Sequence, residues 1–398
     1  MPSLYELQKR KDVDAIIRIL RNSKNEAVRA RAVEILGEIG GERAIRELIN
    51  VVISDDSEMV KSSAAKSIAW ADEKALKMFL EKIEGVKIKG ATWVLVNYLI
   101  KALKSKDKNI RMHAAIALGR IGDDRAVPHL IDALNDKSPA VRRAAAIALG
   151  MIGNNAAVDA LLKRLNDEDV EVRKAALESL TDLNLSKKDI EKVKESLKDP
   201  DPRVRELAAM VLEKGGEAAV EALLEAIEDK VREVRVTATQ SLLGCLARVP
   251  VERSEVIRKK VSDKMVKAKD VAEVVIEVLD KAESGAIKKN AIWLLGQLGD
   301  PKGLEPLLKV LERGTADEKR LAATSLVKMG SNAVDRLGEL IKHSDEEVRR
   351  LVCWILGEIG DIRAKEILNL ALEDPSDRVR SVAFQAINKV ERFNRGIS

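Results

Sequence analysis

The sequence predicts an all-α solenoid built from similar helix pairs, and two observations carry this prediction. A helical phrase returns along the 398 residues, for example as VRARAVEILGEIG at 28–40, VRRAAAIALGMIG at 141–153 and VRRLVCWILGEIG at 348–360. The composition agrees, because apolar residues make up 46% of the chain but aromatic residues only 2%. Small and aliphatic side chains suit the packing of helix on helix, whereas strands favour aromatic and β-branched residues.

The phrase occurs eleven times, and most successive copies are 30 to 32 residues apart, a period typical of solenoids. We number each copy from its first residue, position 0, which is Val28, Val60, Ile110, Val141, Val172, Val204, Val234, Ile287, Glu318, Val348 and Val379. Positions 4, 7, 8 and 11 are mainly Ala, Leu and Ile, and at about 100° per residue they share one side of a helix with position 0. Each copy is therefore predicted to form an amphipathic helix, here called helix B.

The start and end of helix B are also predicted. Position −3 holds Asn, Ser, Asp or Thr in ten of the eleven copies, and these residues are good N-caps. The glycine that is common near position 12 is expected to end the helix. A shorter amphipathic stretch between copies, such as 125–136 or 156–167, is expected to form a second helix, helix A. One repeat is thus helix A, a tight turn and helix B.

This pattern resembles the HEAT-repeat family, in particular its short phycobilin-lyase-like subtype, whose helix B reads much like V-R-x-x-A-A-x-A-L-G-x-I-G-D. The resemblance covers roughly residues 12–391, nearly the whole chain. It implies a right-handed α-solenoid of about eleven helix pairs, with the B helices on the concave side and the A helices on the convex side.

Two steps break the period: 50 residues from Val60 to Ile110, and 53 residues from Val234 to Ile287. Each gap holds one additional helix-like stretch, near 72–83 and near 251–266. We expect a single solenoid over residues 1–398 in which these two extra helices change the local curvature. They would separate the blocks 12–70, 86–250 and 268–393.

Composition and charge limit the classes of partner. The chain has 70 basic and 65 acidic residues, a net charge of +5, so it is no polycation. No apolar run is long enough to span a bilayer, and residues 1–12 lack the apolar region of a secretory signal. We expect a cytoplasmic protein without membrane contact, with Cys245 and Cys353 as small buried side chains. Four glutamines beside abundant Lys and Glu favour a thermophilic source.

Position 1 is basic in every copy. The arginines at this position are Arg29, Arg111, Arg142, Arg173, Arg205, Arg235, Arg349 and Arg380. Five residues before position 0, six copies carry an aspartate, at 55, 136, 167, 199, 229 and 374. Such residues form a ladder between successive repeats in the HEAT family, and the resemblance implies the same structural ladder here. The alternative is that this row of cations binds a ligand.

Positions 2 and 6 face outward from helix B and mix apolar, aromatic and basic residues. Apolar side chains among charges are typical of a protein-binding groove. We expect a protein or peptide partner to contact Lys289, Trp293, Arg320, Arg350, Trp354, Arg143, Lys174, Met112 and Met210. The first five belong to three consecutive copies and should form one strip, with the two tryptophans about 16–20 Å apart. The alternative is that the apolar side chains only fill gaps between B helices.

Residues that could carry catalysis are few. His113, His129 and His343 lie far apart in the sequence, and none is followed by Glu. HEAT-like deoxyhypusine hydroxylases bind a di-iron centre through His-Glu pairs, so that chemistry is not expected. A HEAT-like DNA glycosylase needs an acid in an aromatic-lined pocket; Asp182 and the tryptophans leave this open, but no motif supports it. Bilin lyases share the repeat, which alone carries no activity. We expect no enzyme, no cofactor, no metal and no small-molecule substrate.

The alternative function is a nucleic-acid-binding solenoid that grips DNA backbone phosphates. Residues 101–111 and 258–269 are both rich in Lys and Arg, with one Asp each. Charge runs more often mark solvated faces, and neither segment is interleaved with aromatic residues.

Overall fold

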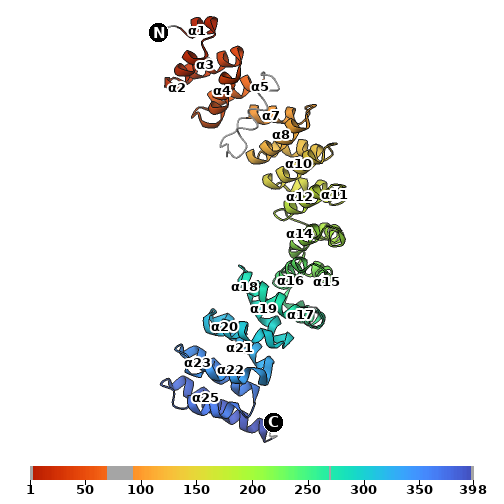
Figure 1. Cartoon of the computed structure of the whole chain (residues 1–398), viewed down its shortest axis with the longest axis vertical. Helices are drawn as coiled ribbons and strands as arrows, with labels where there is room; N and C mark the ends of the chain where they lie inside the picture. Colours follow the sequence, from red (N-terminus) through yellow and green to blue (C-terminus); the bar gives the residue numbers. More distant parts are fainter. Residues whose placement is uncertain (1–2, 70–92, 269, 396–398) are drawn as a thin grey trace. The chain divides into compact units, whose positions relative to one another are not determined.

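The computed structural model describes residues 3–69, 93–268 and 270–395. Within these ranges the chain forms α-helices and short 3-10 helices and contains no strand (Figure 1). The all-α prediction is therefore confirmed. The chain divides into two compact units, residues 1–193 and 194–398. The extra helix that we expect near 72–83 lies outside the described residues.

In the first unit, A and B helices alternate after a short N-terminal helix, α1 (Leu4–Arg10), which the repeat pattern did not predict. The A helices are α2 (Val13–Asn22), α4 (Glu42–Ser54), α7 (Trp93–Ala102), α9 (Val127–Ala133), α11 (Val158–Arg164) and α13 (Lys187–Lys194), which ends the unit. The B helices are α3 (Glu26–Ile39), α5 (Glu58–Ala69), α8 (Lys108–Ile121), α10 (Pro139–Ile152) and α12 (Val170–Leu180). Helices α8, α10 and α12 contact one another in sequence order, as expected for a solenoid.

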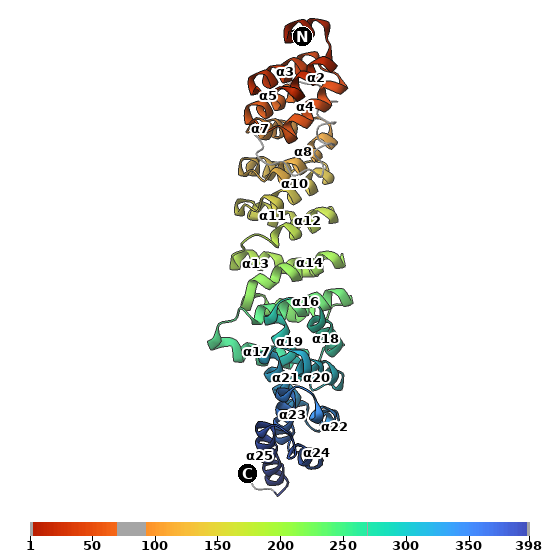
Figure 2. The same ribbon diagram turned by 90° about the vertical axis from the view of Figure 1, so that its left-hand side faces the viewer.

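The second unit continues the same alternation (Figure 2). Its A helices are α15 (Val220–Ala226), α18 (Val271–Lys281), α20 (Leu304–Arg313), α22 (Val334–Glu339) and α24 (Ala364–Ala371). Its B helices are α14 (Pro202–Leu212), α16 (Arg232–Leu246), α19 (Gly285–Leu298), α21 (Ala316–Met329), α23 (Glu346–Ile359) and α25 (Asp377–Asn394). The extra helix expected near 251–266 is α17 (Val251–Met265), which contacts α15, α16 and α19.

Capping explains why the B helices begin and end where they do. The residue at position −3 is the N-cap of nearly every B helix, and Asp169 and Asp201, for example, accept hydrogen bonds from two backbone N–H groups each. At the other end, Gly122, Gly153 and Gly360 adopt positive φ and stop their helices. The predicted starts and glycine stops are confirmed at these helices.

A second glycine, at position 9, sets how closely successive B helices approach. A Cβ atom added to Gly296 would lie 2.6 Å from the Cα of Ser325, at position 7 of the next helix B. The Ser325 hydroxyl in turn donates to the Ile292 carbonyl of the first helix, at 3.0 Å. The same geometry joins Gly150 and Ser179 in the first unit. The backbones of successive B helices therefore pack directly on one another at Gly150 and Gly296, because neither glycine has room for a side chain.

We predict that Gly296→Ala destabilises the chain by about 1–3 kcal/mol, because the new methyl group meets backbone atoms of α21 that cannot easily move. Gly285→Ala in the same helix is the matched control, since nothing lies within 4 Å of its added Cβ. Thermal and urea unfolding would measure both variants. Equal stabilities of the two variants would contradict this account of the contact.

Candidate partner-binding surface

The arginine at position 1 of helix B connects its own repeat to the next one. Arg142 shows the geometry: its Nε and Nη2 donate to the two carboxylate oxygens of Asp167, at 2.9 and 2.7 Å. Its Nη1 donates to the backbone carbonyl of Asp136, in the turn before its own helix, at 3.0 Å. The side chains are only 7% and 3% exposed. We call such an Arg–Asp pair a rung.

The same rung recurs in four more repeats. Five of the eight predicted ladder arginines make this bidentate contact, in the pairs Arg29–Asp55, Arg111–Asp136, Arg142–Asp167, Arg205–Asp229 and Arg349–Asp374. Each of the five also donates through Nη1 to a carbonyl in the turn before its own helix. A rung therefore fixes two turns at once, and a planar guanidinium with five donors suits this task.

The remaining position-1 residues differ in their contacts. Arg173 donates to the Asp167 carbonyl at 2.9 Å, and Arg380, in the last repeat, donates to Asp374 and Asp377. Lys319 reaches Asp345 at 2.7 Å. Arg235 precedes the inserted helix α17. Its Nη1 donates to the Asp229 carbonyl at 2.9 Å, as in a rung, but its Nη2 makes one 3.3 Å contact to Asp270 instead of a bidentate pair. Among the described residues its buried Nε has no hydrogen-bond partner. The insertion thus interrupts the ladder.

The rungs shift the pKa of their carboxyl groups. Burial acts to raise the pKa of Asp167, but hydrogen bonds from Arg142 and from a backbone N–H outweigh it, so the pKa lies below its usual value. The pKa of Asp136 and that of Asp229 are lowered in the same way. For Asp374 the hydrogen bond from Arg349 is the largest influence, and its pKa is also lowered.

We predict that Arg142→Ala lowers the free energy of unfolding by about 3–5 kcal/mol, because it leaves the Asp167 carboxylate buried without its partner. Arg143→Ala is the matched control, since this adjacent side chain is exposed. Urea unfolding of both variants checks the prediction. If the two substitutions have equal effects, the rung does not stabilise the stack.

The lowered carboxyl pKa values predict a pH dependence. A carboxyl group whose pKa is lowered by folding adds stability above its unfolded pKa, about 3.9, and this stability is lost as the pH falls through the folded value. The difference in Tm between the wild type and Arg142→Ala should therefore narrow as the pH falls below about 4. Melting curves from pH 7 to pH 2 measure it. A difference of constant size would show that the Asp167 charge is not involved.

The predicted partner-binding residues lie on B helices of both units. Lys289 and Trp293 are on α19, Arg320 is on α21, and Arg350 and Trp354 are on α23. Helix α21 contacts both α19 and α23, so these five residues lie on three neighbouring helices of the second unit. We call them the B-helix strip. Met210 is on α14 of the same unit, whereas Met112, Arg143 and Lys174 are on α8, α10 and α12 of the first unit.

The apolar members of the predicted site are only partly accessible. Trp293, Trp354 and Met112 are half-buried, and Met210 is 44% exposed. These side chains both pack against their surroundings and present a surface to solvent. Sequence reasoning missed Met151 at position 10 of α10, which is 54% exposed. Its signal was available, because position 10 lies one helical turn after position 6 on the same face.

The cations of the strip are paired with acidic residues of the chain. Lys289 contacts Asp317 at 2.8 Å, and Arg320 lies 3.9 Å from the same carboxylate. Arg350 makes a bidentate contact with Glu347, at 2.8 and 2.7 Å. These three cations are therefore already engaged with carboxylates of the chain itself.

Trp293 has a neighbour that the repeat pattern could not supply. The guanidinium carbon of Arg258, from the inserted helix α17, lies 4.8 Å from the centre of the Trp293 ring. This distance is within the range of a cation–π interaction. Arg258 stands outside the eleven copies, so no position in the repeat pointed to it.

Comparison with known proteins decides the family. The sequence profile of the HEAT repeats matches residues 13–84, 96–181 and 304–388, more than half of the chain, and that of the PBS lyase HEAT-like repeat matches residues 287–313. The chain belongs to the HEAT-repeat family. A HEAT repeat-containing taxis protein of Halobacterium salinarum is 30% identical over 405 residues, which cover 98% of this chain and 99% of the relative.

Two solved structures are also similar to this HEAT-repeat chain. One is an engineered protein with 22% identity and a TM-score of 0.42, covering 96% of this chain and 99% of its own. The other is the complex of CpcE and CpcF of phycocyanin lyase from Nostoc, with 22% identity and a TM-score of 0.37, covering 66% of this chain and 94% of its own.

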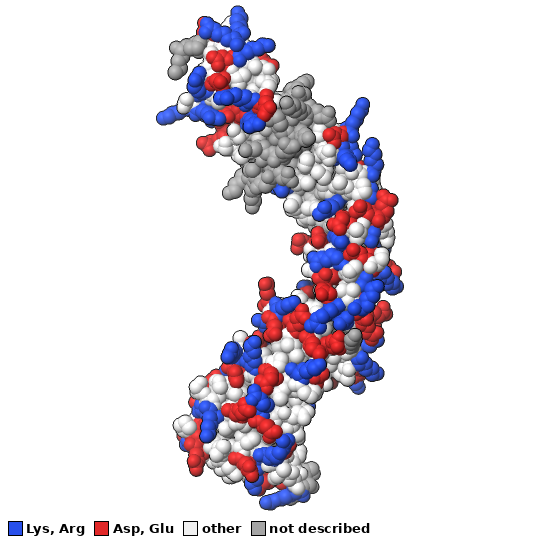
Figure 3. All heavy atoms as spheres, in the orientation of Figure 1, with Lys and Arg blue, Asp and Glu red and all other residues white. Residues whose placement is uncertain are grey.

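Several basic residues of α17 form ion pairs with the preceding repeat. Arg253 pairs with Glu217 at 2.6 Å, and Lys264 pairs with Glu228 at 2.9 Å. Lys260 pairs with Glu221. On the face shown in Figure 3, Lys and Arg are interspersed with Asp and Glu rather than gathered into a continuous basic track. A surface that follows phosphates would be more uniformly basic.

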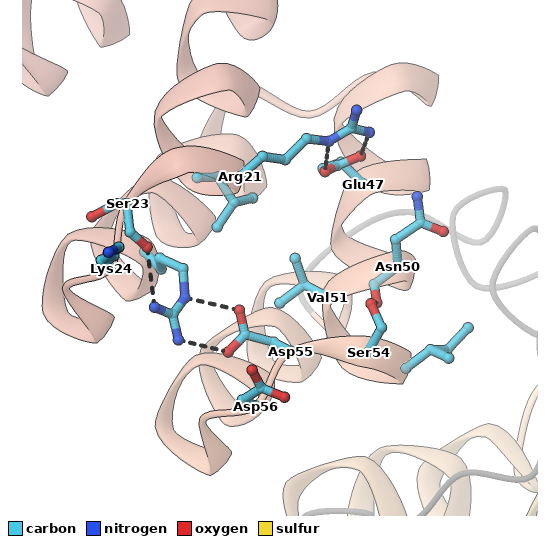
Figure 4. Close-up of a pocket in the computed structure, with 12 residues that line it drawn as sticks. Arg21, Ser23, Lys24, Glu47, Asn50, Val51, Ser54, Asp55 and Asp56 are labelled. Carbon is cyan, nitrogen blue, oxygen red and sulfur yellow. Dashed lines mark hydrogen bonds and ion pairs between the residues drawn. The ribbon is translucent and has the colours of Figure 1, made fainter.

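A cleft of about 940 Å³ opens between the α2–α3 turn and α4 in the first unit (Figure 4). Arg21 on its wall binds the buried Glu47 through two contacts of 2.6 Å, and Arg29 forms its rung with Asp55 there. Both guanidinium groups are thus engaged with carboxylates. Among the described residues, no group of His, Cys, Asp and Glu is arranged to hold a metal ion, and no helix is long and apolar enough to cross a membrane.

Proposed function

We propose that this HEAT-repeat protein is a non-catalytic scaffold that binds a protein partner and acts in taxis. The observation that carries the proposal is the similarity to the Halobacterium taxis protein, at 30% identity over nearly the full length of both chains. A match of this extent includes every repeat rather than one shared motif. HEAT repeats as such support a binding role, because their stacked helices present a long surface and no catalytic group.

The B-helix strip is the surface that we propose for the partner. Two half-buried tryptophans, Trp293 and Trp354, lie on α19 and α23, with the exposed Thr324 on α21 between them. Indole rings fixed by their surroundings lose little conformational entropy on binding, which is why tryptophan is enriched in binding hot spots. The charged side chains around them are already paired, as in the polar rim of a protein interface.

Site-specific photo-crosslinking in the cells that carry this protein tests the proposal. We expect p-benzoylphenylalanine in place of Thr324 to crosslink a protein of the taxis machinery, identified by mass spectrometry. The same group in place of Lys309, exposed on the A helix α20, is the control and should give no such product. The double variant Trp293→Ala, Trp354→Ala should abolish both the crosslink and the taxis response.

Three results would contradict the proposal. One is equal crosslinking from Thr324 and Lys309. Another is a double tryptophan variant that melts several degrees lower while its folded fraction still binds, since the tryptophans would then only fill the core. The third is binding of the protein to random duplex DNA with an affinity that falls steeply as the salt concentration rises, because this would indicate that the protein binds phosphates instead.

A further inference from the structure

We propose that Arg258, Trp293 and Asn290 form a binding site for a carboxylate side chain of the partner, next to an apolar group that contacts the indole. The site lies at the α19 end of the B-helix strip and rests on the proposed scaffold function, whose partner it describes chemically. It is built by the inserted helix α17, which the regular repeat does not contain.

Helix α17 packs against α15, α16 and α19, and this packing places Arg258 next to α19. Three ion pairs join it to the preceding repeat, from Arg253, Lys260 and Lys264 to glutamates 217, 221 and 228. On its inner side, Val261 and Met265 are fully buried. Arg258 is half-buried between this apolar side and the exposed side of the helix.

The guanidinium group is held by three neutral groups. Its Nε donates to the Ser254 hydroxyl at 3.2 Å, its Nη2 donates to Oδ1 of Asn290 at 2.6 Å, and its face lies over the Trp293 ring. Asn290 is only 3% exposed, and its Nδ2 donates to the Leu243 carbonyl in the last turn of α16 at 2.8 Å. Both ends of the Asn290 amide are therefore fixed, and its oxygen is directed at Arg258.

No carboxylate of the described chain neutralises Arg258. Burial lowers its pKa, and no acidic group acts in the opposite direction. Each rung arginine, by contrast, binds an aspartate through two nitrogens. Among the described residues, Nη1 of Arg258 has no hydrogen-bond partner, and it is not buried. One edge of the guanidinium, with Nη1 and the second hydrogen of Nη2, is thus open to a ligand.

This edge fits a carboxylate better than a phosphate. Two parallel N–H groups match the two oxygens of a carboxylate, and a partly desolvated charge favours an anionic partner. A single guanidinium balances one negative charge, and the nearby Lys289 is already paired with Asp317. The half-buried indole of Trp293 supplies an apolar contact beside the charge. A partner segment with an acidic residue next to an apolar one would supply both the carboxylate for Arg258 and the apolar group for Trp293.

Selection from a displayed library of random twelve-residue peptides tests the site without knowledge of the natural partner. We expect the wild-type protein to enrich peptides that share one Asp or Glu next to an apolar residue. For such a peptide, Arg258→Gln should weaken the Kd about tenfold, because a bidentate charged hydrogen bond is lost. Replacing the peptide's Asp or Glu with Asn or Gln should raise the Kd by the same factor. Combining this peptide with Arg258→Gln should raise the Kd little further.

Lys259→Gln, next to Arg258 on the same helix and exposed, is the matched control and should leave the Kd unchanged. The amide peptide needs no protein variant, so it tests the site even if Arg258→Gln melts early. Three outcomes would overturn the carboxylate site: enrichment of peptides without an acid, no enrichment of any peptide, and an amide peptide whose Kd equals that of the acidic one. If Thr324 crosslinks a partner but the peptides show no preference for an acid, the carboxylate site is wrong and the proposed scaffold function stands. If the peptides are acid-selective but Thr324 crosslinks no protein, the proposed scaffold function is wrong and the carboxylate site stands.

Discussion

At five junctions between successive repeats, a guanidinium group binds a carboxylate across the junction and a carbonyl within its own repeat. In Arg142 the three nitrogens divide this work, with two on Asp167 and one on the Asp136 carbonyl. Removing two charges from water is costly, so such a pair is favourable only when most of its hydrogen bonds are made. The rung therefore favours one position of a repeat along the helix axes of its neighbour. Apolar packing of helix on helix is less specific about this position.

The choice between Arg and Lys at position 1 follows the presence of this carboxylate. Arginine stands wherever the turn of the next repeat supplies an aspartate. Lysine stands at three positions where that turn has a different residue: Lys61 precedes Ser105, Lys288 precedes Arg313 and Lys319 precedes His343. Arg235, before the insertion, is the exception, because the corresponding residue is Ala282. Only the fork of an arginine can bind both carboxylate oxygens and a carbonyl at once. The row of cations that suggested a bound ligand in the sequence is thus mainly a connection between repeats.

Repetition made the fold predictable, and the absence of repetition limited the prediction of the site. The eleven copies gave the position of each helix B and its caps, because every copy must satisfy the same packing and hydrogen-bonding needs. Arg258 belongs to the inserted helix α17, so no second copy exists from which its role could be inferred. The pairing of Lys289 with Asp317 and of Arg350 with Glu347 also escaped sequence reasoning, since it depends on rotamers and on contacts between helices.

A double-mutant cycle on the rung between Arg111 and Asp136 tests the central claim most directly. Urea unfolding would give the free energies of the wild type, Arg111→Ala, Asp136→Ala and the double variant. If the rung connects successive repeats, the two substitutions are strongly coupled, with an interaction energy of about 1–3 kcal/mol, and the double variant loses far less stability than the sum of the singles. Additive losses would contradict the account, because each residue would then stabilise the chain independently of the other.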